Sequence, residues 1–189
     1  MKRVVEEAIA RAGLLPVLAA RRSGDLDAVR AKAPAWRKAD LLALGAAADI
    51  ARAEGAGDVV RIHERASADV TWVEIAPGES ELDLLRAVAV ARLASAPSAR
   101  VGVDWSRCGL ELAQVALGFG ASDLRGPITK KSGLPVLDGE TLKVKGQGMV
   151  ELRAIKKREI AALVGHAGRR AVFVDDLGAP HALEEHAPA

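Results

Sequence analysis

Apolar residues recur with helical spacing through the first part of the chain. The pattern between Val4 and Ala12 is interrupted by Gly13 and Pro16, which predicts a short helix or a helix pair. Asp25 follows a Ser-Gly break and is expected to cap a helix that runs to about residue 32. Pro34 is expected to end this helix. A further apolar stripe begins after Asp40 and stops at Gly55 and Gly57. We therefore expect residues 1–57 to be mainly helical.

The pattern changes after this segment, because short β-prone runs now alternate with helical ones. Residues 59–62 and 70–75 read as strands separated by the polar stretch 63–69. The alternation continues with a helix after Ser80, a strand over 100–105, a helix over 109–119, a strand or its exit loop over 121–128, a helix near 156–164 and a last strand over 171–174. Successive strand and helix units at this spacing indicate an α/β fold with parallel strands.

The stretch LPVLDGETLKV at 134–144 departs from this alternation. Asp138-Gly139 between alternating apolar residues predicts an inserted β-hairpin. Residues 177–189 contain prolines and no apolar periodicity, which predicts a flexible tail. The expected organisation is a helical segment over 1–57, an α/β core over 58–176 that contains the hairpin, and the tail.

Composition narrows the function classes. Half of the 189 residues are hydrophobic, enough for one main domain with a sizeable core, and aromatic residues make up only 3%. The formal net charge of +2 gives no large field of one sign, so we expect neither nucleic acid nor an anionic membrane as partner. No apolar run approaches the roughly 20 residues of a membrane span, and Glu6 and Glu7 interrupt any secretion signal, so a cytoplasmic protein is expected.

Cys108 is the only cysteine in the sequence. Iron–sulfur clusters and thiolate zinc sites need several thiolates, so this chain cannot supply such a site, and it cannot form an internal disulfide. We expect no cofactor.

Several segments resemble, in order, parts of the radical S-adenosylmethionine enzymes of the futalosine route to menaquinone and of the related deazaflavin-forming enzymes. DLLALGAAAD at 40–49 is similar to the helix before their first barrel strand, and LLRAVAVARL at 84–93 to a late helix. The segment GLELAQVALGFGASDLRGPI at 109–128 resembles their glycine-bounded helix and GA-x-D-L-x-G loop, with Asp123, Leu124 and Gly126 on the matching positions. Residues 157–168 resemble their closing helix. The resemblance implies a partial (β/α) barrel.

The chain departs from this family at the loop after the first strand. The family carries a CxxxCxxC motif there, which holds a [4Fe–4S] cluster, whereas this chain has HERASAD at 63–69 and no cysteine. The intervening barrel units are also missing. The resemblance therefore implies a cluster-less pseudoenzyme or accessory protein linked to menaquinone metabolism. Because a partial barrel leaves open sheet edges, we expect a homodimer or a partner chain that completes the sheet.

Two strand-end loops carry the candidate binding residues, because ligands of α/β proteins bind where parallel strands end. The loop DWSRC at 104–108 and the loop DLRGPIT at 123–129 combine carboxylates, guanidinium groups and an indole. The predicted ligand-binding residues are Asp104, Trp105, Arg107, Gln114, Asp123, Arg125 and Thr129. The expected ligand is a small aromatic or nucleoside-like molecule. In the alternative interpretation, Asp104 or Ser106 caps the helix and Asp123 and Arg125 form a surface ion pair.

Other chemistry-bearing residues favour ordinary roles. Cys108 lies at a predicted helix start, which would lower the pKa of its thiol, but a small, partly buried thiol is the better interpretation. The histidines and glutamates of 181–186 belong to the tail, and His63-Glu64 reads as a surface pair. Two functions besides binding stay open. One is an enzyme with Asp104 or Asp123 as base and Arg107 or Arg125 as anion holder, and the other is a purely structural interaction domain.

Overall fold

The computed structural model describes residues 2–36, 38–129, 155–175 and 178–180. The predicted hairpin at 134–144 and the end of the tail, 181–189, lie outside these residues. Within the described part, no helix is long and apolar enough to cross a membrane.

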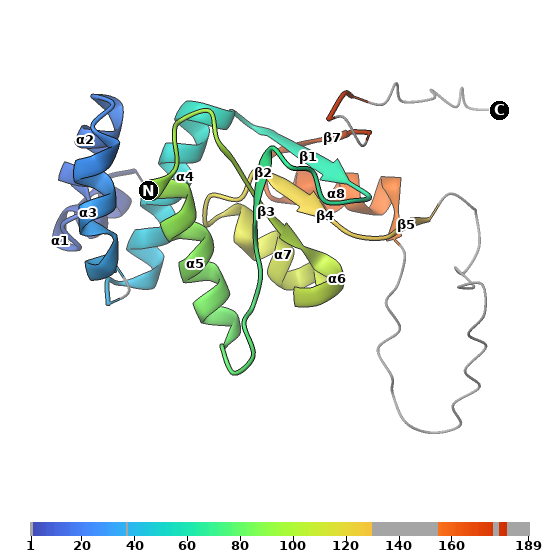
Figure 1. Cartoon of the computed structure of the whole chain (residues 1–189), viewed down its shortest axis with the longest axis horizontal. Coiled ribbons are helices and arrows are strands. Elements are labelled where there is room, and N and C mark those ends of the chain that lie inside the picture. Colours follow the sequence, from blue (N-terminus) through green and yellow to red (C-terminus); the bar gives the residue numbers. More distant parts are fainter. Residues whose placement is uncertain (1, 37, 130–154, 176–177, 181–189) are drawn as a thin grey trace.

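Helices precede the first strand. They are α1 (Lys2–Arg11), α2 (Leu15–Arg22), α3 (Leu26–Trp36) and α4 (Leu41–Ala56). Asp25 accepts a hydrogen bond from the Ala28 backbone N–H at 3.0 Å, and Asp40 caps α4 by accepting from the Ala43 N–H at 2.8 Å. The first three helices gather at one end of the molecule (Figure 1).

The prediction that Pro34 ends the third helix is wrong, since α3 continues to Trp36 with Pro34 inside it. Proline removes one backbone donor and crowds the preceding turn, but only the last turn of α3 is affected, so the helix ends soon after the proline without breaking at it.

The strands form one parallel sheet in the order β2-β3-β4-β1-β7. Their bounds are β1 (Val59–His63), β2 (Val70–Val73), β3 (Arg100–Asp104), β4 (Asp123–Arg125) and β7 (Arg170–Phe173). The helices between or after them are α5 (Glu81–Ala94), α6 (Trp105–Cys108), α7 (Leu110–Leu117) and α8 (Lys157–His166). A separate parallel pair joins β5 (Ile128–Thr129) to β6 (Ile155–Lys156). The predicted α/β class is confirmed.

Strand alternation gives this sheet two different faces. One face presents Val60, Ile62, Val101, Val103 and Leu124, all fully buried in the core cluster that the helices also form. The register places polar groups opposite one another on the other face, where Arg61 lies beside Asp123 and Asp104 beside Arg125. We call this second surface the polar face. It carries Arg61, His63, Trp72, Arg100, Gly102, Asp104, Asp123 and Arg125, and Val59, Val70 and Val172 share this face.

Arginines anchor the helices at their C-terminal ends. Arg21 of α2 donates to the carbonyls of Leu93 and Ser95, and Arg52 of α4 donates to the carbonyl of Gly57. These carbonyls have no partner within their own helices, and cations are favourable at this end of the helix dipole. These bonds tie α2 to the end of α5 and close the end of α4.

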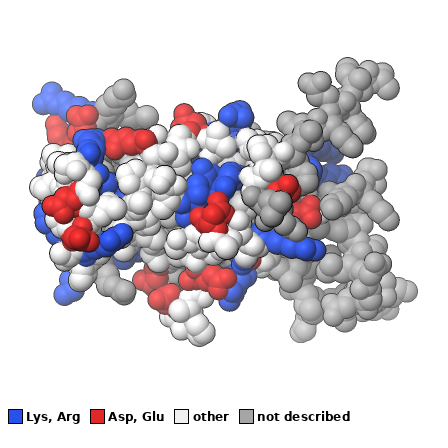
Figure 2. Space-filling view, turned by 45° about the horizontal axis from the view of Figure 1, so that its top comes forward, with Lys and Arg blue, Asp and Glu red and all other residues white. Residues whose placement is uncertain are grey.

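Both charge signs occur on the face of the molecule that Figure 2 shows. Acidic and basic groups are interspersed there, with no extended field of one sign among the described residues of that face. This agrees with the near-neutral composition.

Candidate functional site at the polar face

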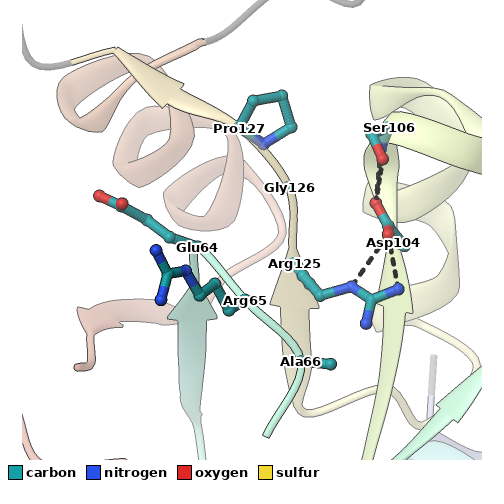
Figure 3. A pocket seen from close by; sticks show the side chains of 8 residues that line it. All are labelled: Glu64, Arg65, Ala66, Asp104, Ser106, Arg125, Gly126 and Pro127. Carbon is teal, nitrogen blue, oxygen red and sulfur yellow. Dashed lines mark hydrogen bonds and ion pairs between the residues drawn. The ribbon is translucent and has the colours of Figure 1, made fainter. Parts of the chain in front are cut away.

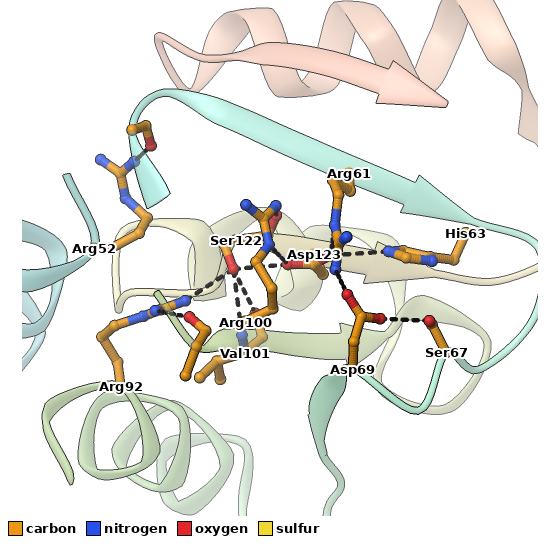
Figure 4. A network of polar contacts seen from close by, with 12 residues as sticks. Arg52, Arg61, His63, Ser67, Asp69, Arg92, Arg100, Val101, Ser122 and Asp123 are labelled. Atoms are coloured by element: carbon orange, nitrogen blue, oxygen red, sulfur yellow. Dashed lines mark hydrogen bonds and ion pairs between the residues drawn. The ribbon is translucent and has the colours of Figure 1, made fainter. Parts of the chain in front are cut away.

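A fully buried carboxylate lies at the centre of the polar face. Asp123 Oδ1 accepts hydrogen bonds from His63 Nε2 at 2.8 Å and Arg61 Nε at 2.7 Å. Asp123 Oδ2 accepts from Arg100 Nε at 2.8 Å and from the Ser122 hydroxyl at 2.7 Å. Figure 4 shows these side chains converging on Asp123 from neighbouring strands. We call Arg61, His63, Arg100, Ser122 and Asp123 the buried network.

The donors in this network control the ionisation of Asp123. Burial alone would raise the pKa of the carboxyl, but the hydrogen bond from His63, the charge of Arg100 and the bonds from Ser122 and Arg61 outweigh it, so the pKa lies below its usual value. Asp123 is therefore a charged structural anchor, and with no exposed surface it offers no base to a ligand.

Arg92 of α5 connects the network to the helix layer. Its guanidinium donates to the Ser122 hydroxyl at 2.8 Å and to the Gly120 carbonyl at 2.8 Å. Burial, together with the charges of Arg21 and Arg100, lowers its pKa to about 10, so the group remains a cation at neutral pH. This link ties the loop before β4 to the helix layer.

A second polar cluster lies at the carboxyl ends of β3 and β4. Arg125 Nε donates to Asp104 Oδ2 at 2.9 Å, and the Ser106 backbone N–H and hydroxyl donate to Asp104 Oδ1 at 2.9 and 2.6 Å. Glu74 contacts Arg125 at 3.4 Å and also pairs with Arg107. Each Asp104 oxygen thus already accepts from the protein.

A hollow of about 400 Å³ opens beside this cluster. Figure 3 shows Asp104, Ser106 and Arg125 on one side and residues 64–66 on the other, with Gly126 and Pro127 along the strand exit. The hollow therefore lies at the carboxyl ends of β1, β3 and β4, where the sequence predicted a binding mouth. The Nη1 group of Arg125 makes no hydrogen bond within the described residues.

The predicted binding residues do not all reach this hollow. Asp104 and Arg125 line it, and Arg107 joins them through Glu74. Gln114 instead donates to the Leu163 carbonyl at 3.2 Å and ties α7 to α8. Asp123 lies in the buried network, and Thr129 belongs to β5.

Trp105 is buried behind the hollow. Its indole packs against Gly126, where an added Cβ would approach Trp105 Cε2 to 2.3 Å, so the strand exit needs glycine for this close approach. The indole Nε1 is buried and has no hydrogen-bond partner in the described structure. Trp105 therefore shapes the wall behind Gly126 and does not cover a ligand at the surface.

The two local pairings expected from the sequence differ in outcome. Asp104 does cap α6 through the Ser106 N–H. The expected surface ion pair between Asp123 and Arg125 is wrong, because Asp123 pairs with Arg61 and Arg100 while Arg125 pairs with Asp104. Asp123 and Arg125 lie two positions apart on β4 and both point to the polar face, so each meets an oppositely charged group of an adjacent strand.

Cys108 does not lie at a helix start. It is the last residue of α6, and burial followed by the charge of Asp104 raises the pKa of its thiol to about 11. The preferred interpretation of a small, partly buried thiol is therefore confirmed, and the alternative of a pKa lowered by a helix N-terminus is wrong.

Sequence reasoning missed the residues around Asp123. His63 was expected at the surface but is 2% exposed and bonded to Asp123. A signal was present, because charged residues occupy alternate positions in VVRIH, RVGVD and DLR. This pattern predicts a polar sheet face, but only tertiary pairing shows that the three strands are neighbours.

No group of three or more histidine, cysteine, aspartate or glutamate side chains that could hold a metal ion occurs among the described residues. The histidines at 181 and 186 lie outside them. Chemically, the hollow offers a guanidinium fixed by internal partners, a serine hydroxyl and mixed charges. It suits recognition of a polar ligand better than proton abstraction, since Asp104 and Asp123 are both occupied by donors.

Comparison with known proteins finds no family model that matches the chain and no curated protein that matches its sequence.

Proposed function

We propose that this chain is a cluster-less relative of the radical S-adenosylmethionine enzymes of the futalosine route that binds a small polar ligand, as a binding or accessory protein. The observation that carries the binding proposal is the hollow lined by Asp104, Ser106 and Arg125 at the carboxyl ends of the strands. Parallel α/β proteins bind their ligands at this end of the sheet.

Strand order supports a partial barrel. In a closed eight-stranded barrel, strands follow one another in sequence and the last pairs with the first. Removal of the strands between the first and the last three would leave the order β2-β3-β4-β1, with β4 paired to β1, and this is the order observed. β7 then takes the place beside β1 that a second barrel strand would have.

The two faces of the sheet give a second argument. A doubly wound sheet has helices on both faces and apolar strands throughout, whereas a barrel has helices outside only. Here the face with Val60, Val101 and Leu124 belongs to the helix-covered core, and the opposite face is charged. The charged face corresponds to a barrel interior.

The connection between β1 and β2 gives a third argument for a partial barrel. Parallel strands are ordinarily joined by a crossover of a dozen or more residues, most often a helix. Residues 64–69 alone make this connection, and they contain no helix. A connection this short fits the replacement of several barrel units, and it occupies the place of the cluster-binding loop in the family.

Thermal unfolding with candidate ligands tests the proposal. We expect at least one compound from a panel of futalosine-type nucleosides, quinones and S-adenosylmethionine to raise Tm, since a ligand at 100 times its Kd adds about 2.7 kcal/mol to the stability of the native state. Calorimetric titration of that compound should show at least tenfold weaker binding to Arg125→Gln.

Arg22→Gln is the matched control, because Arg22 forms an exposed pair with Glu54 on the helical part of the chain. Ser106→Ala provides a milder change in the hollow. If no compound stabilises the wild-type protein, or if Arg125→Gln and Ser106→Ala bind as tightly as Arg22→Gln, binding in this hollow is refuted.

A further inference from the structure

Trp72 of β2 lies across the polar face and contacts residues of β3, β4 and β1. Its indole passes over Gly102 of β3, where an added Cβ would approach Trp72 Cζ3 to 2.5 Å. Beyond Gly102 it meets the His63 ring of β1 edge-on, with ring centroids 5.3 Å apart. A side chain at position 102 would prevent this reach.

The indole nitrogen of Trp72 fixes one side of the hollow. Trp72 Nε1 donates to the Ser67 carbonyl at 3.0 Å. Ser67 directly follows residues 64–66, which form the wall opposite Arg125. Farther along the same segment, Asp69 pairs with Arg61 at 2.8 Å.

The ring face of Trp72 supports the other side of the hollow. The Arg125 guanidinium lies over the indole with its central carbon 4.9 Å from the ring centroid. A cation over an indole face is attracted to it, and Asp104 holds the same guanidinium from its edge. One side chain thus contacts both walls.

We propose that Trp72 is the positioning residue of the hollow, which sets the separation between the wall of residues 64–66 and the wall of Arg125. The hydrogen bond to Ser67 holds the first wall, and the ring face holds the second. This inference assigns a role within the proposed binding function, but the geometry it concerns is measurable without any ligand.

The test measures the distance across the hollow in the full chain. Ala66 lines one side of the hollow, and Arg107 directly follows Ser106 on the other. Nitroxide labels at these two exposed positions would be introduced in a Cys108→Ser background and their distance distribution measured by pulsed electron paramagnetic resonance. Trp72→Phe removes the hydrogen bond to Ser67 and keeps an aromatic ring, so the distribution should broaden. Trp72→Leu removes both contacts and should broaden it further.

Trp36→Phe is the control, because Trp36 is a buried tryptophan at the end of α3, within the helical part of the chain and away from the hollow. It should lower Tm and leave the distance distribution unchanged. An unchanged distribution in Trp72→Phe, or equal broadening in Trp36→Phe, overturns the proposal. Failure of the proposed function is distinguishable from failure of this inference. If the proposed function is wrong, no compound of the ligand panel raises Tm, whatever the distance measurement gives.

Discussion

The carboxylate of Asp123 on β4 neutralises the guanidinium groups that the two flanking strands, β1 and β3, bring to one place. Arg61 and Arg100 each have 17% of their side chains exposed, and the carboxylate itself has none. A buried charge of this kind is tolerated because each oxygen accepts well-aligned donors. Its removal would leave the guanidinium groups without their shared counter-charge.

We therefore expect Asp123→Asn to reduce the free energy of unfolding by about 3–5 kcal/mol, the usual cost of breaking a buried ion pair from one side. Urea denaturation at neutral pH measures this value. Asp69→Asn is the control, because Asp69 is 54% exposed and its pair with Arg61 should contribute less than about 1 kcal/mol. Similar losses in the two variants would contradict a special role for the buried carboxylate.

The same network predicts the acid side of the stability profile. Because the folded pKa of Asp123 is depressed, its contribution is fully present above the unfolded value of about 3.9 and is lost as pH falls through the folded pKa. Unfolding free energy should therefore fall steeply below about pH 4 in the wild type. The decline should be shallower in Asp123→Asn, as denaturant titrations at a series of pH values would show.

Cys108 gives a prediction about reactivity. With its pKa raised to about 11, the thiol should react slowly with iodoacetamide at pH 8, and the rate should still be increasing at pH 10. Mass spectrometry of the labelled chain follows the reaction. A rate that levels off below pH 9 would show that burial and Asp104 do not control this thiol.

At the scale of elements, glycine positions decide how closely strands and side chains approach. Trp72 needs the free surface of Gly102, and Trp105 needs that of Gly126. In both places the aromatic ring lies where a Cβ would be. The polar face therefore depends on residues that carry no chemistry of their own.

Gly102→Ala should destabilise the protein by about 1–3 kcal/mol, the usual cost of overpacking, because the new methyl group meets Trp72 and the Asp123 carbonyl. Gly165→Ala in α8 is the opposite case. No atom lies within 4 Å of its added Cβ, so the variant should be up to about 1 kcal/mol more stable through helix propensity. Thermal unfolding compares the two, and equal effects would contradict the packing argument.

Local patterns predicted most elements because their signals are local. Ser80 and Asp83 form a reciprocal capping box at the start of α5, and Asp40 caps α4. Two predicted element ends were wrong. α3 continues past Pro34, and Trp105 begins α6 where the sequence predicted the last residue of a strand. A cap or a turn depends on a few adjacent residues, whereas the exact end of an element also depends on what packs against it.

At the scale of the whole molecule, β2 is an edge strand. Its sequence, VTWV, contains no charge and no proline, which are the residues that usually protect such an edge from pairing with another chain. Thr71 is exposed on it. The homodimer stays a prediction, and this edge is where a second copy would pair.

Sedimentation at micromolar concentration should then show a dimer, and Thr71→Lys should shift it toward monomer by placing charges at the joined edges. Ala53→Lys adds the same charge to an exposed site of α4 and should leave the dimer intact. A wild-type protein that sediments as one monomeric species would exclude this association.

The sequence by itself determined the α/β class, most helices and strands, and the presence of a single cysteine, and it pointed to the strand-end loops beside which the candidate hollow lies. Periodicity and caps depend on a few adjacent residues, and composition is a property of the whole chain, so the sequence alone contains these signals. Tertiary structure alone decided that β4 pairs with β1, and so that Asp123 meets His63 from 60 positions away. Parallel pairing between distant segments leaves no local signal, and burial exists only once the strands are assembled, so neither the buried network nor the altered pKa values were predictable from the chain alone.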